Sequence, residues 1–101
     1  MKLQQLRCIF QIVQSDFNIS KASEVLNTSQ PGVSKQIKLL EDEIGIKIFQ
    51  RNGKRLVNLT EPGELILSSI EIILQESNNI KVISLYTLMG YTTILIIKFA
   101  F

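Results

Sequence analysis

The sequence has no histidine and no tryptophan, and its only cysteine is Cys8. Without histidine the chain lacks the most frequent general base and the most frequent metal ligand. A single cysteine can neither close an internal disulfide nor complete a zinc site. We therefore expect no enzyme activity, no cofactor and no metal, and a reducing compartment, the cytoplasm. The N-terminal stretch MKLQQLRCIF is too polar, and is interrupted too early by Arg7, to be a signal peptide.

The net charge of the chain is small, but charges of one sign cluster in parts of the sequence. The formal net charge is only +2 over 101 residues, which is enough chain for one small domain with an appendage. A basic stretch without Asp or Glu runs from 47 to 55, and residues 61–76 contain acids without Lys or Arg. The acids at 41–43 are interpreted as solvent-exposed rather than as a metal site. A local basic stretch on a nearly neutral domain is typical of a surface that binds a polyanionic partner.

Apolar residues at helical spacing predict two helices before residue 27. The first covers 2–16, and Cys8 lies in it as a small core residue. Its expected buried face consists of Leu3, Leu6, Phe10 and Val13, continued by Phe17. Asn18 and Ser20 then offer capping oxygens for a short second helix, which continues through Ala22, Val25 and Leu26.

A third helix is predicted from Ser29, its N-cap, to Gly45, its stop. Val33, Ile37, Leu40 and Ile44 form its inner stripe, and Pro31 lies in its first turn. This stripe turns Pro31, Lys35 and Lys38 outward, with Ser34 at the edge of the exposed face. Helix, short helix, tight turn and helix make a helix-turn-helix. The cations at the front of the third helix can meet DNA, and the acids at 41–43 stay clear of it.

A hairpin and a long helix are predicted to follow. Asn52-Gly53 between apolar runs favours a two-stranded wing, with Arg51, Lys54 and Arg55 around its tip. Thr60 is the expected cap of a fourth helix, whose apolar seam needs a partner on a finished domain. We expect this seam to form a homodimer, through Ile66, Ile70, Ile73 and Ile80.

The motif chain TSQPGVSKQIKLLEDEIGIKIFQR followed by LTEPG resembles the N-terminal DNA-binding domain of LysR-type transcriptional regulators. The resemblance covers residues 1 to about 83 and is greatest to the CysB branch, which activates sulfate assimilation and cysteine synthesis. Gly32 stands where most members have alanine. The stretch from Arg51 to Thr60 is one residue longer than the commonest pattern.

The resemblance implies a mainly α fold, a winged helix-turn-helix with a two-stranded wing and a long C-terminal linker helix. Residues 1–59 would bind double-stranded DNA, residues 60–83 would pair two copies, and residues 84–101 form an apolar tail outside the pattern. By position, Gln30, Pro31, Ser34 and Lys35 would face base edges. Lys38 and Arg51 would lie on phosphates, and Thr28 and Ser29 near the DNA backbone.

The tail leaves alternatives open. Residues 82–97 are uncharged, but the run is short of the ~20 apolar residues of a membrane helix, so we do not expect a membrane anchor. A truncated or out-of-frame product explains the loss of pattern, and so does a short regulator whose tail extends the dimer. Roughly twenty residues cannot enclose the ~300 Å³ of an effector site, so DNA binding should ignore inducers. The rival functions are an interaction module that forms heterodimers with intact homologues and inhibits them, and a small membrane-anchored protein held through the tail.

Overall fold

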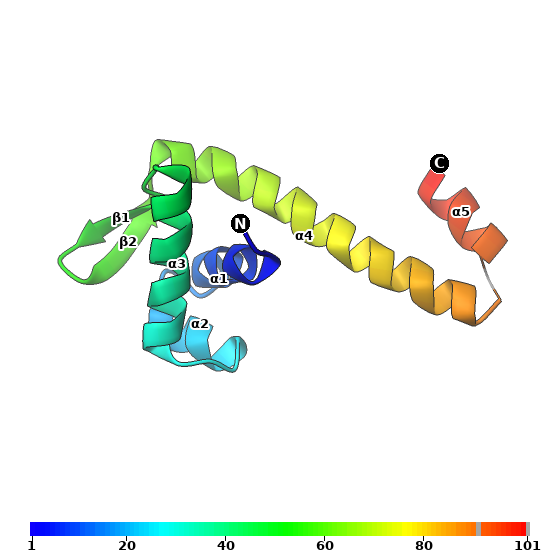
Figure 1. Ribbon diagram of the computed structural model, residues 1–101, viewed down its shortest axis with the longest axis horizontal. Coiled ribbons are helices and arrows are strands. Elements are labelled where there is room, and N and C mark those ends of the chain that lie inside the picture. The colour runs from blue at the N-terminus through cyan, green and yellow to red at the C-terminus, as the bar shows by residue number, and fades with distance from the viewer. Residues whose placement is uncertain (91, 101) are drawn as a thin grey trace. The chain divides into compact units, whose positions relative to one another are not determined.

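The computed structural model describes residues 1–90 and 92–100 (Figure 1). In chain order its elements are α1 (Leu3–Gln14), α2 (Ile19–Val25), α3 (Gln30–Ile44), β1 (Phe49–Asn52), β2 (Arg55–Leu59), α4 (Glu61–Leu88) and α5 (Thr92–Ala100). The chain divides into two compact units, Met1–Glu71 and a second one from Ile72 onward. The predicted fold class, a mainly helical winged helix-turn-helix with a long fourth helix, is confirmed.

The core of the first unit lies among α1, α2 and α3, which contact one another pairwise. The prediction that Cys8 is a core residue is confirmed, but the predicted face of α1 is partly wrong. Leu3 is exposed, and Phe10 and Val13 are only half-buried. The buried face of α1 is rotated relative to the predicted one, because Ile9 and Ile12 also supply apolar area to it. The fully buried apolar side chains of α1 and α3 are Leu6, Cys8, Ile9, Ile12, Val33, Ile37 and Leu40.

The prediction that Phe17 continues the first helix is also wrong. α1 ends at Gln14, and both Asp16 and Phe17 have positive φ, 54° and 64°. Left-handed backbone costs roughly 1–2 kcal/mol at a residue with a Cβ, so a tertiary contact must favour it. The Phe17 ring packs edge-to-face on Phe49, with 6.2 Å between the ring centroids. This contact ties the turn between α1 and α2 to the base of the wing.

The hairpin differs from its sequence prediction in the position of its turn. Asn52 pairs with Arg55, so the two linking residues are Gly53 and Lys54 rather than Asn52 and Gly53. Gly53 has a φ of 64°, and Asn52 keeps a negative one. Gly53 therefore supplies the left-handed backbone that the turn requires, at no steric cost.

The wing contains a β-bulge at Val57. Gln50 pairs with Asn58 and Arg51 pairs with Leu56, so Val57 has no partner on β1. In a regular strand, residues three apart point to opposite faces. The bulge shifts this alternation, and Leu56 and Leu59 are both buried while Val57 is exposed.

The start of α4 is fastened to the residue before the wing. Thr60 caps α4, as predicted, by accepting the N–H of Gly63 at 3.0 Å. The Thr60 N–H and hydroxyl both donate to the Ile48 carbonyl, at 2.9 and 3.2 Å. A Cβ on Gly63 would overlap that same carbonyl oxygen. Only glycine permits this approach of backbone to backbone.

In the second unit, α4 runs to Leu88, so the predicted linker boundary at residue 83 falls inside the helix. Gly90, with a φ of 84°, follows the end of α4, and the tail predicted as being of unknown structure contains α5. Within residues 1–90 and 92–100, no helix combines the length and the apolar character that crossing a bilayer requires. Tyr91 and Phe101 lie outside the described residues.

Candidate nucleic-acid interface

The N-terminus of α3 is built as predicted. The Ser29 hydroxyl accepts the Gly32 N–H at 3.1 Å, and Pro31 occupies the first turn, where its missing N–H costs nothing. Gly45, with a φ of 73°, ends the helix. A helix begun this way presents free backbone N–H groups and a partial positive charge at its first turn, which favours an anion there.

The outer face of α3 is open. The predicted contact residues on it are all exposed: Gln30, Pro31, Ser34, Lys35 and Lys38. Thr28 and Ser29, just before the helix, are exposed too. Of the predicted inner stripe, Val33, Ile37 and Leu40 are buried, whereas Ile44 lies at the surface near the C-terminus. The predicted division of the helix into two faces is confirmed, and the contacts of its outer face with DNA remain predictions.

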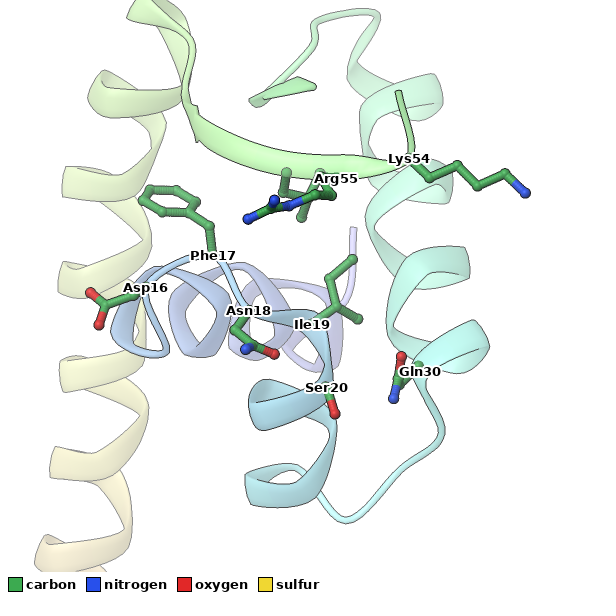
Figure 2. Close-up of a pocket in the computed structure, with 9 residues that line it drawn as sticks. Asp16, Phe17, Asn18, Ile19, Ser20, Gln30, Lys54 and Arg55 are labelled. Atoms are coloured by element: carbon green, nitrogen blue, oxygen red, sulfur yellow. The ribbon is translucent and has the colours of Figure 1, made fainter. Parts of the chain in front are cut away.

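The tip of the wing lies close to the N-terminus of α3. Lys54 and Arg55 line one hollow of about 380 Å³ together with Gln30 and with residues 16–20 (Figure 2). Figure 2 shows Arg55 extending toward Phe17 and Lys54 pointing away from it. A cation on the wing and the first residue of α3 therefore border the same surface. The segment from Asp16 to Ser20 also borders it, and sequence reasoning missed this part because no basic residue or motif marks it.

The cations of this surface are unneutralised. Within residues 1–90 and 92–100, neither an ion pair nor a hydrogen bond engages the side chains of Lys35, Lys38, Lys54 and Arg55. An exposed cation without an internal partner can exchange its counterions for a phosphate, which is the main source of affinity for DNA. Residues 1–90 and 92–100 contain no group of His, Cys, Asp and Glu placed to bind a metal ion.

Arg51 differs from the other wing cations. Its Nη2 donates to Oε1 of Glu41 at 3.0 Å, and the two form an ion pair. The Glu41 side chain is 1% exposed, so the prediction that this acid lies in solvent is wrong. The sequence held a signal for this burial, because Glu41 follows Ile37 by one helical turn and adjoins Leu40 on the buried stripe. The predicted contact of Arg51 with a phosphate stays a prediction.

The other two acids at the end of α3 are exposed, as predicted. Oε2 of Glu43 pairs with the N-terminal ammonium of Met1 at 2.8 Å, and Asp42 has no ion pair or hydrogen bond among the described residues. The order of charges along α3 therefore runs from free cations at its front to mostly neutralised acids at its back.

The four isoleucines predicted to form a dimer seam have different environments. Ile70 is 1% exposed and belongs to the first unit, so the expectation that a monomer leaves it in water is wrong. The domain core already covers this side chain. Ile66 is half-buried, whereas Ile73 and Ile80 are exposed. The exposed apolar surface of α4 thus lies mainly after residue 71.

The fold is that of a winged helix-turn-helix protein. It has three packed helices, an open N-terminal face on the third helix and a cationic wing beside that face. A family model described as "Bacterial regulatory helix-turn-helix protein, lysR family" matches residues 3–64. The chain therefore belongs to the lysR family of bacterial regulatory helix-turn-helix proteins, as its motifs predicted.

Individual relatives agree with this membership. The chain is 53% identical over 81 residues to the HTH-type transcriptional regulator CysB of Burkholderia cenocepacia, covering 80% of this chain and 26% of that protein. It resembles full-length OxyR C199D from Pseudomonas aeruginosa with a TM-score of 0.77 and 33% identity, over 83% of this chain and 28% of that one. For the BenM_DBD/catB site 1 DNA complex the TM-score is 0.80 and the identity 25%, over 90% and 96% of the two chains. The chain spans about a quarter of the length of the CysB protein.

Proposed function

We propose that this chain is a sequence-specific DNA-binding domain that regulates transcription, without enzyme activity, and that it acts as a homodimer in the cytoplasm. The observation that carries the proposal is the shared surface of the α3 N-terminus and the wing tip. There the exposed Gln30 adjoins the wing's unneutralised cations. Relatives with this fold are regulators, and the BenM structure contains DNA.

Within this proposal α3 is the recognition helix. Its first turns enter the major groove, and Gln30, Pro31, Ser34 and Lys35 read base edges. Gln and Lys side chains offer the hydrogen-bond donors that the groove edge of guanine or adenine accepts. Thr28 and Ser29 approach the backbone at the helix N-terminus, and Lys38, Lys54 and Arg55 meet phosphates.

The target genes proposed are those of sulfur and cysteine metabolism, because CysB-type regulators are among the chain's relatives. Pairing of two copies is proposed through residues 60–83. The exposed Ile73 and Ile80 support it, because large apolar side chains gathered along one helix mark an interaction surface.

The test begins with selection of bound sequences from a random duplex library, followed by titration of the selected duplex and of a random one. Lys35→Ala or Gln30→Ala should lower the preference for the selected duplex by ~1–3 kcal/mol. Lys38→Ala should weaken binding to both duplexes alike and flatten the salt dependence by about one unit. Equal losses from both groups of variants on both duplexes would contradict the division into base and phosphate contacts. A chain that enriches no sequence would contradict the proposed function.

A further inference from the structure

A buried carboxylate joins the recognition helix to the wing. Oε2 of Glu41 accepts the backbone N–H groups of Ile48 and Phe49, at 2.7 and 3.3 Å, and Oε1 accepts Nη2 of Arg51 at 3.0 Å. One side chain from the last turn of α3 thus holds both the backbone that leads into β1 and a side chain within β1. Ile48 and Phe49 are buried, so without Glu41 their N–H groups would lose their partners away from water.

The backbone of Ile48 is also held from its other side. The Ile48 N–H donates to Glu41 of α3, while the Ile48 carbonyl accepts the N–H and the hydroxyl of Thr60, the cap of α4. The residue that leads into the wing is therefore held by α3 on one side and by the cap of α4 on the other. The tip of the wing, by contrast, carries cations that have no ion pair among the residues that the structure describes.

We propose that Glu41 and Arg51 are positioning residues, which hold the wing beside the recognition helix so that its tip reaches DNA, and that Arg51 does not itself neutralise a phosphate. The inference rests on the proposed function and replaces the phosphate contact that the family resemblance implies for Arg51. An arginine already paired with a buried carboxylate adds no net charge to the surface. Its removal should therefore leave the number of counterions released on DNA binding unchanged, whereas removal of a free lysine lowers that number.

The substitution Glu41→Gln distinguishes a phosphate contact by Arg51 from a positioning role, because the two predict opposite changes in the affinity for DNA. If Arg51 contacts a phosphate, removing the negative charge beside it should tighten binding. If the pair positions the wing, the same substitution should weaken binding to the selected duplex about tenfold, the usual scale of one lost contact. The matched control is Asp42→Asn, which also removes one negative charge, at the next residue of α3. The Asp42 side chain is exposed and has no partner among the described residues. We expect the control to leave binding unchanged or slightly tighter.

The salt dependence of binding gives a second readout, which a purely structural role would not change. Lys54→Gln should reduce the slope of log K against log salt by about 0.9, because it removes one cation at the DNA surface. Arg51→Gln, which can still donate a hydrogen bond to Glu41 and so keep the wing in place, should leave the slope unchanged. The Arg51 side chain is 37% exposed, so this variant decides the question even if Glu41→Gln fails to fold.

The outcomes distinguish the two proposals. Circular dichroism melts first establish that each variant is folded at the temperature of the titrations. If the wild-type chain binds DNA, tighter binding by Glu41→Gln overturns the positioning role, and so does a slope reduced by Arg51→Gln as much as by Lys54→Gln. A wild-type chain that binds neither the selected nor the random duplex overturns the proposed function itself.

Discussion

Ile70 and Ile80 lie on the same long helix, and truncating each to alanine separates folding from pairing. Ile70 is 1% exposed and Ile80 is 69% exposed. Removing a buried isoleucine side chain costs ~2–5 kcal/mol, through lost burial and the cavity left behind. For a unit of this size, each kcal/mol lowers the melting temperature by about 4–8 °C. Ile70→Ala should therefore melt at least ~8 °C below the wild type.

Ile80→Ala should behave in the opposite way. An exposed truncation changes the stability of the monomer by no more than ~0.5 kcal/mol. If Ile80 packs against a second copy, each copy loses ~1–2 kcal/mol of apolar burial. Two copies together then raise the dimer dissociation constant roughly 30- to 700-fold.

Circular dichroism melts at several protein concentrations and sedimentation equilibrium measure the two effects independently. The concentration series is needed because the melting temperature of a dimer depends on protein concentration. An Ile70→Ala chain that melts like the wild type but sediments as a monomer would refute the assignment of Ile70 to the domain core. An Ile80→Ala chain with an unchanged dissociation constant would show that this part of α4 does not pair.

Three further predictions concern stability. Gly63→Ala should lower the free energy of unfolding by ~1–3 kcal/mol in urea titrations, because the added Cβ overlaps the Ile48 carbonyl, and an unchanged value would contradict the observed approach. Ser29→Ala should cost ~0.5–2 kcal/mol by removing the cap on Gly32, whereas Ser34→Ala, on the same helix but exposed, should cost almost nothing in the same titration. Burial raises the pKa of the Cys8 thiol, so the folded state holds its proton more tightly than the unfolded state. The resulting contribution to stability is complete below the thiol's ordinary pKa of about 8.5 and is lost as pH rises above it. Unfolding titrations at neutral and alkaline pH should show this loss in the wild type and not in Cys8→Ala.

Features fixed by local chemistry could be predicted from the sequence. The caps at Ser29 and Thr60 and the stop at Gly45 depend only on residues within a few positions of each helix end, and all three occur as expected. The outer face of α3 followed from the apolar period alone. The exact turn of the hairpin did not, because Asn-Gly leaves two registers open. The observed register places the turn on Gly53 and Lys54 and has a bulge at Val57.

Features that depend on what covers a side chain could not be predicted. Ile70 and Ile73 belong to one apolar seam in the sequence, yet only Ile70 is buried in the domain core. A seam at three- and four-residue spacing looks the same whether it packs on its own domain or on a second chain. Phe17 shows the same limit, since its ring is apolar but its left-handed backbone takes it out of the helix that the spacing predicted.

The charge order of α3 now has two explanations rather than one. Cations near the front of a helix and acids near its back oppose the macrodipole, so the arrangement costs an isolated helix stability. The exposed lysines at the front are explained by the DNA contact proposed for the helix N-terminus. The acids at the back are explained by the fold, because Glu41 is buried against Arg51 and Glu43 pairs with the N-terminal ammonium. Of the three acids, Asp42 alone has no ion pair or hydrogen bond within the described part of the chain. The acids thus do more than stay clear of DNA, because Glu41 holds the wing whose cations lie beside the recognition helix.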